Sequence, residues 1–207
     1  MNILKNLRKP LTFFLVLLTV ISCAAPNVSN KTTREKLAAT NKALLVFSMT
    51  QPLSSEKYGH SIFRFEREGS ISGAIYAQTH DVMGLTPNPA SEFPNFYGRV
   101  AAVEVPAGEY QVDSMFSTGN GHYSVRGKTE KNTIQVKAGE VVYVGALNVK
   151  LTFGQSFLGV ADVKQVEAEI TDQRARDIPL FKQKYPALGE PEIRLFRLGP
   201  IVGEGKK

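Results

Sequence analysis

The sequence predicts a mostly β fold, a single antiparallel β-sandwich with a short helical segment near its C-terminal end. Three observations support this prediction. Short runs of residues alternate between apolar and polar side chains with a period of two, as half-buried strands do. Clusters of Gly, Pro and Asn separate these runs, as turns would. The chain has one cysteine, so a disulfide within it is excluded and the fold depends on packing.

The first group of expected strands precedes residue 117. In one of them Phe63 and Phe65 share a face, because alternate residues of a strand point the same way. We expect Pro106-Ala107-Gly108 to close a hairpin in which Gly108 has a positive φ. The expected strands are 43–48, 60–66, 70–77, 100–105 and 109–116.

The second group of expected strands follows residue 132. The run 133–137 alternates and is followed by a turn at Ala138-Gly139-Glu140. Residues 141–149 are apolar on both faces, which predicts a central strand that is covered on both sides. The run 162–170 alternates again and predicts a strand with one face in water.

The C-terminal part changes character. Residues 171–185 are charged and favour a helix, which we expect Pro179 to break into short turns. A last strand at 193–198 would precede a solvated tail at 199–207. The helical segment would bury a stripe of three apolar side chains. The three side chains of the stripe are Ala175, Ile178 and Phe181.

The N-terminal 22 residues have the parts of a secretory signal: a basic start, an apolar run at 11–21 and a small residue at the end. A helix needs about 20 apolar residues to cross a bilayer, so this run does not predict a permanent span. The junction Val20-Ile21-Ser22-Cys23 resembles the lipobox of bacterial lipoproteins. An ordinary secretory signal with an incidental cysteine is the alternative.

The lipobox resemblance implies that Cys23 carries a diacylglycerol on its sulfur and that cleavage falls before it. Ala24 is similar to the sorting residue of outer-membrane lipoproteins, which implies an outer-membrane location facing the periplasm in a diderm bacterium. Residues 23–41 are small or polar and predict a flexible tether, with a short helix capped by Thr33 as one option. The domain itself would be 42–207.

Composition argues against nucleic-acid binding. The formal charge is +6, but the expected signal contains Lys5, Arg8 and Lys9. Removing these three leaves 22 Lys and Arg against 19 Asp and Glu, a charge of +3 that is scattered along the chain. The remaining length suits one domain.

Two similar units, 103–112 and 134–145, each place a turn with Ala-Gly-Glu between alternating runs. They resemble uncharacterised envelope lipoproteins with an immunoglobulin-like sandwich of the transthyretin-like or carboxypeptidase-regulatory-like kind. The resemblance implies a fold and offers no catalytic residues.

Motifs for catalysis are absent from the sequence. The segment Gly69-Ser70-Ile71-Ser72-Gly73 has isoleucine where a hydrolase elbow has its nucleophile. His60, His80 and His122 are each alone in sequence, and their convergence on a metal would suit a metal-assisted hydrolase of the envelope. The other interpretation is that each is an ordinary surface or loop residue, with no cofactor.

The long segment 78–98 lacks strand periodicity and is rich in proline and aromatic residues, so it is a candidate binding loop. Its candidate contacts are Phe93, Phe96 and Tyr97, although these aromatics would equally suit a cap on the core. We therefore expect a non-catalytic binding or assembly module that is anchored by lipid and has an envelope protein as its partner.

Overall fold

The structure is a computed structural model that describes residues 28–29, 31–53, 59–67, 75–78, 90–119, 123–124, 133–155 and 161–204. The expected signal and Cys23 lie outside these residues. The described helices and strands are α2 (Arg34–Ala39), β1 (Lys42–Gln51), β2 (Gly59–Arg67), β3 (Ile75–Gln78), β4 (Tyr97–Pro106), β5 (Gly108–Gly119), β6 (Tyr123–Ser124), β7 (Thr133–Val136), β8 (Val141–Gln155), β9 (Ala161–Thr171), α3 (Arg174–Lys184), η2 (Pro186–Leu188), β10 (Glu192–Ile193) and β11 (Leu198–Glu204).

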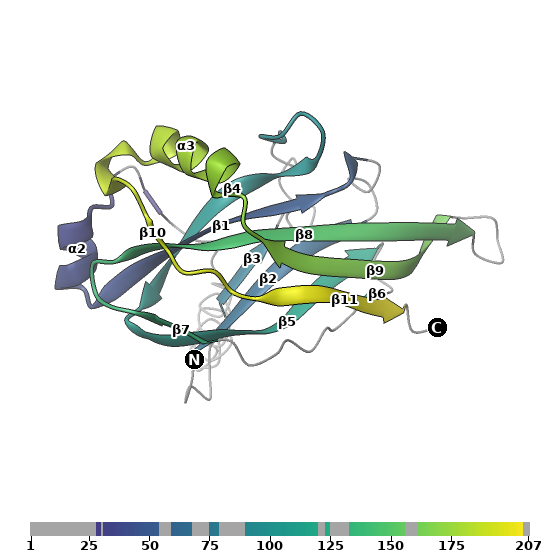
Figure 1. Ribbon diagram of the computed structural model, residues 1–207, viewed down its shortest axis with the longest axis horizontal. Coiled ribbons are helices and arrows are strands. Elements are labelled where there is room, and N and C mark those ends of the chain that lie inside the picture. The colour runs from purple at the N-terminus through teal and green to yellow at the C-terminus, as the bar shows by residue number, and fades with distance from the viewer. Residues whose placement is uncertain are drawn as a thin grey trace, which may run out of the picture.

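The described strands form two sheets, as Figure 1 shows. Sheet A has the order β11-β9-β8-β1-β4, and β10 also pairs with β8. Sheet B has the order β3-β2-β5-β6, and β7 also pairs with β5. The chain is thus mostly β, as the sequence predicts.

Sheet A is mixed, so the prediction of a purely antiparallel fold is wrong. β1 runs parallel to β8, and β10 also runs parallel to β8. The reason is the path of the chain, which leaves sheet A after β4, passes through sheet B and re-enters as β8 at the end where β1 begins. Leu44 of β1 lies opposite Val141, the first residue of β8.

The two Ala-Gly-Glu turns are corners between the sheets, and the hairpin that we expected at Gly108 does not form. β4 pairs with β1 in sheet A, whereas β5 pairs with β2 and β7 in sheet B. The second turn likewise joins β7 of sheet B to β8 of sheet A, with Gly139 at a φ of 83°. At both corners a tight turn takes the chain from one sheet to the other. The sequence of such a turn looks the same as that of a hairpin turn, so the local pattern does not distinguish the two.

One hydrophobic cluster joins the inner faces of the two sheets. Phe47 of sheet A lies 5.1 Å from Phe65 of sheet B, measured between ring centroids. Tyr110 of β5 is also buried there and donates a hydrogen bond from its hydroxyl to the Pro106 carbonyl at 2.8 Å. Burying such side chains gives about 25 cal/mol per Å² of apolar surface, which is the main force that holds the layers together.

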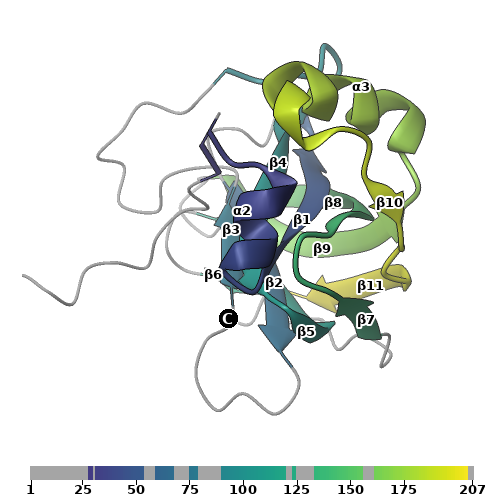
Figure 2. The ribbon, with the colours of Figure 1, turned by 90° about the vertical axis from the view of Figure 1, so that its left-hand side faces the viewer.

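A second hydrophobic cluster covers the other face of sheet A. It includes Leu37 of α2, Phe181 of α3 and Tyr143 of β8. Figure 2 shows α3 on the side of sheet A away from sheet B. Residues 141–147 of β8 are therefore buried on both faces, which confirms the prediction that this strand is central.

The part of the expected tether at 31–41 is folded onto the domain. α2 begins at Arg34, and the Thr33 hydroxyl accepts a hydrogen bond from the Lys36 amide at 3.3 Å, as a helix cap does. Leu37 has only 1 % of its surface exposed. The amphipathic helix is too short to be stable alone, so packing on β1 accounts for its order.

Two expectations for the C-terminal part are also corrected. α3 continues through Pro179, and its buried side chains are Asp177, Ile178 and Phe181, whereas Ala175 is exposed. The buried residues on both sides of the proline hold the helix on sheet A. β11 replaces most of the expected tail, because Leu198–Glu204 pairs with β9.

Candidate functional site

The candidate binding loop places its three aromatic residues in different environments. Phe93 and Tyr97 are buried, with 5 % and 3 % of their surfaces exposed. Phe96 is exposed by 47 %. Two of the three residues thus cap the core, and only Phe96 is available to a partner. The earlier part of the candidate segment, 79–89, lies outside the described residues.

A serine hydroxyl organises the described part of this loop. Ser91 Oγ accepts hydrogen bonds from the amides of Phe93 and Gly98, both at 3.1 Å, and donates one to the Phe96 carbonyl at 2.6 Å. These hydrogen bonds hold the loop against the first residues of β4. Phe96 is therefore presented from a backbone that is fixed at both ends.

The same loop protects the outer edge of β4, an edge strand of sheet A. Glu92 accepts a hydrogen bond from the Val100 amide at 2.8 Å, and Lys184 of α3 donates one to the Val100 carbonyl at 2.7 Å. Glu92 and Lys184 also form an ion pair. An edge strand with free amides and carbonyls can pair with another chain. The bonds with Glu92 and Lys184 occupy the amide and the carbonyl of Val100 and so block such pairing at this residue.

Leu53 lies at the same end of sheet A as Phe96. β1 ends at Gln51, which lies opposite Tyr97, the first residue of β4. Leu53 follows the end of β1 and Phe96 precedes the start of β4, so both lie at this end of the sheet. Leu53 is exposed by 49 %. Within the described ranges, these two are the large hydrophobic residues that are exposed rather than buried or half-buried. We call them the Leu53–Phe96 patch.

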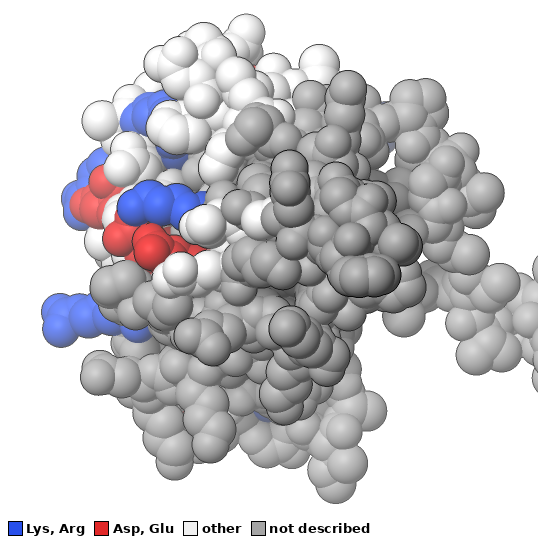
Figure 3. All heavy atoms as spheres, turned by 90° about the vertical axis from the view of Figure 1, so that its right-hand side faces the viewer, with Lys and Arg blue, Asp and Glu red and all other residues white. Residues whose placement is uncertain are grey.

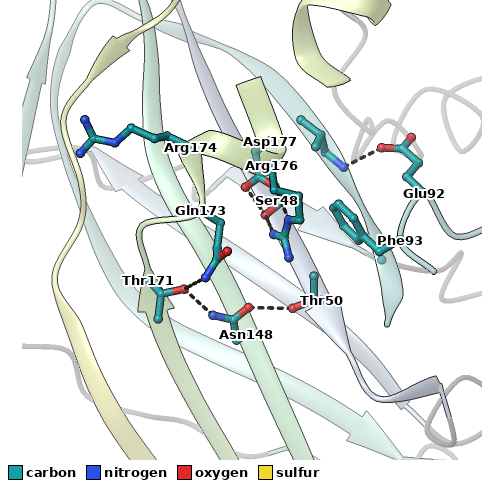
Figure 4. Close-up of polar contacts among 12 residues, drawn as sticks. Ser48, Thr50, Glu92, Phe93, Asn148, Thr171, Gln173, Arg174, Arg176 and Asp177 are labelled. Atoms are coloured by element: carbon teal, nitrogen blue, oxygen red, sulfur yellow. Dashed lines mark hydrogen bonds and ion pairs between the residues drawn. The ribbon is translucent and has the colours of Figure 1, made fainter. Parts of the chain in front are cut away.

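A buried carboxylate lies under α3, and Figure 4 shows its contacts. Asp177 is fully buried and accepts hydrogen bonds from the Ser48 and Tyr143 hydroxyls at 2.6 and 2.7 Å. Arg176 donates to the other carboxylate oxygen at 2.7 Å and lies 4.2 Å from the Phe93 ring centroid. Burial and the nearby carboxylate raise the pKa of Tyr143 well above its ordinary value.

This cluster anchors α3 to sheet A. Ser48 of β1 donates to the Asp177 carboxylate of α3 and accepts from Arg176 at 2.9 Å. A nucleophilic serine needs an adjacent base and access to substrate, and Ser48 is fully buried. The geometry therefore fits a structural network rather than a reacting centre.

A row of polar side chains continues from the anchor across sheet A (Figure 4). Thr50 donates to the Asn148 side-chain oxygen at 2.8 Å, and Asn148 donates to the Thr171 hydroxyl at 2.6 Å. Gln173, at the start of α3, reaches the same hydroxyl at 3.4 Å. These bonds tie three strands of sheet A to the beginning of the helix.

Two open depressions flank the segment between β10 and β11. One, of about 460 Å³, is lined by Thr171, Arg174 and Leu195 among others. Arg174 is already paired with Asp172, which lowers the pKa of that carboxyl. The other, of about 470 Å³, is lined by Arg194, which binds Glu140 at 2.7 Å. Arg174 and Arg194 are thus both already paired with carboxylates of the chain.

The hypothesis of a metal site concerns three histidines whose side chains lie outside those that the structure describes. His80 and His122 lie outside the described residues, and of His60 only the backbone, in β2, is described. Among the side chains that the structure describes, no group of three or more His, Cys, Asp or Glu is close enough to hold a metal ion.

Comparison with known proteins gives no family for this chain. No protein-family model, curated protein or solved structure matches it.

Charge and hydropathy add two findings about the described residues. Figure 3 shows basic and acidic side chains next to each other on the displayed face, without a field of one sign among the coloured atoms. No described helix is long and apolar enough to cross a membrane.

Proposed function

We propose that this protein is a lipid-anchored, non-catalytic binding or assembly module of the bacterial envelope. The lipobox-like junction Val20-Ile21-Ser22-Cys23 supports the anchor, as does the use of the single cysteine at that position. Ala24 supports an outer-membrane location facing the periplasm. The core shared by the two sheets supports a β-sandwich architecture.

The observation that carries the binding proposal is the exposure of Phe96 on a fixed loop. An aromatic side chain that is already held in place loses little entropy on binding, and such residues dominate the energy of many interfaces. Leu53 is the other exposed large hydrophobic residue at this end of sheet A. The partner is therefore an envelope protein with an apolar pocket that receives the Phe96 ring.

Replacing Cys23 by Ala tests the anchor. The variant should lack the lipid and leave the membrane fraction, because stable anchoring requires the acyl chains. Membrane fractionation and intact mass of the purified chain measure this. A C23A variant that stays membrane-bound in high salt would contradict the anchor.

Replacing Phe96 by Ala tests the binding site. The variant should keep most of the thermal stability of the native chain, because 47 % of Phe96 is exposed to solvent. It should lose its partner in co-purification from crosslinked cells.

Phe93→Ala is the matched control, because it removes the same ring from a buried position in the same loop. It should lower the free energy of unfolding by about 3–5 kcal/mol. If Phe96→Ala destabilises the protein as much as Phe93→Ala, or keeps the partner, the assignment of Phe96 is wrong.

A further inference from the structure

The chain between Cys23 and the folded domain is short. Val28 is partly buried against the cluster that covers the outer face of sheet A. Four residues lie between Cys23 and Val28, so five Cα-to-Cα steps join them and their α-carbons are at most about 18 Å apart in any conformation. If Cys23 is lipidated as proposed above, the domain is held at the bilayer surface.

The packed start of the chain lies at the end of sheet A where β1 begins. The Ser29 carbonyl accepts a hydrogen bond from the Thr32 amide at 2.9 Å, which turns the chain there. The Thr32 hydroxyl donates to Glu104 at 3.2 Å, and Glu104 faces Leu44, the third residue of β1. The tether therefore enters beside α2, which Figure 1 places at this end.

Exposed lysines lie at this end. Lys31 and Lys36 are exposed and have no ion pair among the described residues. Lys137 is also exposed, and its turn is held to this end by the Gly139 amide, which donates to the Lys42 carbonyl at 2.7 Å. Of the acidic groups nearby, Glu104 is paired with Lys42 at 3.0 Å, Glu140 with Arg194 at 2.7 Å and Glu190 with Lys182 at 3.2 Å. Glu35 is exposed.

We propose that this end of the domain, with Lys31, Lys36 and Lys137, is a membrane-contact surface that faces acidic lipid headgroups. Lysines near a bilayer are attracted to anionic lipids within about one Debye length, roughly 10 Å. The tether limits Val28 to about 18 Å from Cys23, which is short enough for the lysine side chains at this end to reach that range. This proposal rests on the lipidation of Cys23.

The orientation has a consequence for the partner. From Leu44 to Gln51, β1 runs seven residues, which is about 23 Å at 3.3 Å per residue. The Leu53–Phe96 patch lies beyond Gln51, at the opposite end of the strand. The partner therefore meets the patch on the side away from the membrane that holds the anchor.

Site-specific labelling tests the proposal. The native chain has one cysteine, which the lipid occupies, so Ala39→Cys on α2 and Asn95→Cys beside Phe96 each add a single labelling site. Both positions are exposed. The lipidated full chain is placed on vesicles of phosphatidylcholine and phosphatidylglycerol that contain a headgroup quencher. A fluorophore at position 39 should be quenched several-fold more than one at position 95.

Two further variants separate the effect of the short tether from the effect of the lysines. A flexible spacer of about 25 Gly and Ser residues between Cys23 and Val28 should remove most of the difference, because the domain then rotates freely. Lys31→Glu with Lys36→Glu should reduce quenching at position 39 on these vesicles but not on phosphatidylcholine alone.

The outcomes distinguish this proposal from the proposed function. Equal quenching at both positions, or stronger quenching at position 95, on protein whose mass shows the lipid would overturn the orientation and leave the anchor intact. A mass without lipid on Cys23 would overturn both.

Discussion

Replacing Gly98 by Ala should prevent β1 and β4 from pairing. Gly98 lies opposite Thr50 in the β1–β4 ladder, and an added Cβ would be 2.0 Å from the Met49 carbonyl oxygen. This neighbour is backbone in a strand that is buried on both faces, so it has nowhere to move. Overpacking of this kind costs about 3 kcal/mol or more. Denaturant unfolding of the purified variant, or its soluble yield, measures the loss.

Gly189→Ala is the control for backbone strain. Gly189 has a φ of 67°, and an added Cβ there would meet no atom within 4 Å. Its ψ is −155°, a backbone conformation that essentially only glycine adopts, so this variant should lose about 1–3 kcal/mol from strain alone. An unfolding midpoint of Gly98→Ala close to that of Gly189→Ala would show that the strands separate easily at Gly98.

Replacing Asp177 by Ala should destabilise the protein by about 3–5 kcal/mol, because removing one partner leaves the others of a buried charged network unpaired. The Ser48 and Tyr143 hydroxyls would lose their acceptor, and Arg176 would lose its counter-ion. α3 should then dissociate from sheet A. Equilibrium unfolding by urea gives the free energy, and hydrogen exchange of the α3 amides shows the detachment.

Asp172→Ala is the matched control, because Asp172 also pairs with an arginine of α3 but lies at the surface. Surface ion pairs contribute little, so this variant should unfold close to the native midpoint. Equal effects at Asp172 and Asp177 would show that the buried network does not hold the helix.

Most of the strands were predictable from the sequence because alternation reports which residues face the core, but most of β11 was expected to be a solvated tail. The sheet to which each strand belongs was not. Pro106-Ala107-Gly108 and Ala138-Gly139-Glu140 have the composition of hairpin turns, yet each joins sheet A to sheet B. Which strands pair with each other depends on contacts between residues that are distant in sequence, such as Leu44 with Val141. No local pattern encodes these contacts.

The candidate site was predictable only in part. The sequence singled out an aromatic loop, but not that α3 covers Phe93 while Phe96 remains exposed. Asp177 was missed because a charged residue is normally assigned to a solvated helix face. Its position four residues before Phe181 was the available signal, because residues i and i+4 share a helix face.

A photo-crosslinking residue at position 96 of the full-length protein in its own cells tests the central claim most directly. Position 39 on α2, at the other end of β1, is the comparison. The account predicts a crosslink to one envelope protein from position 96, its loss when Leu53 is replaced by Asp, and no such product from position 39. The same products from both positions, or none from position 96, would contradict it.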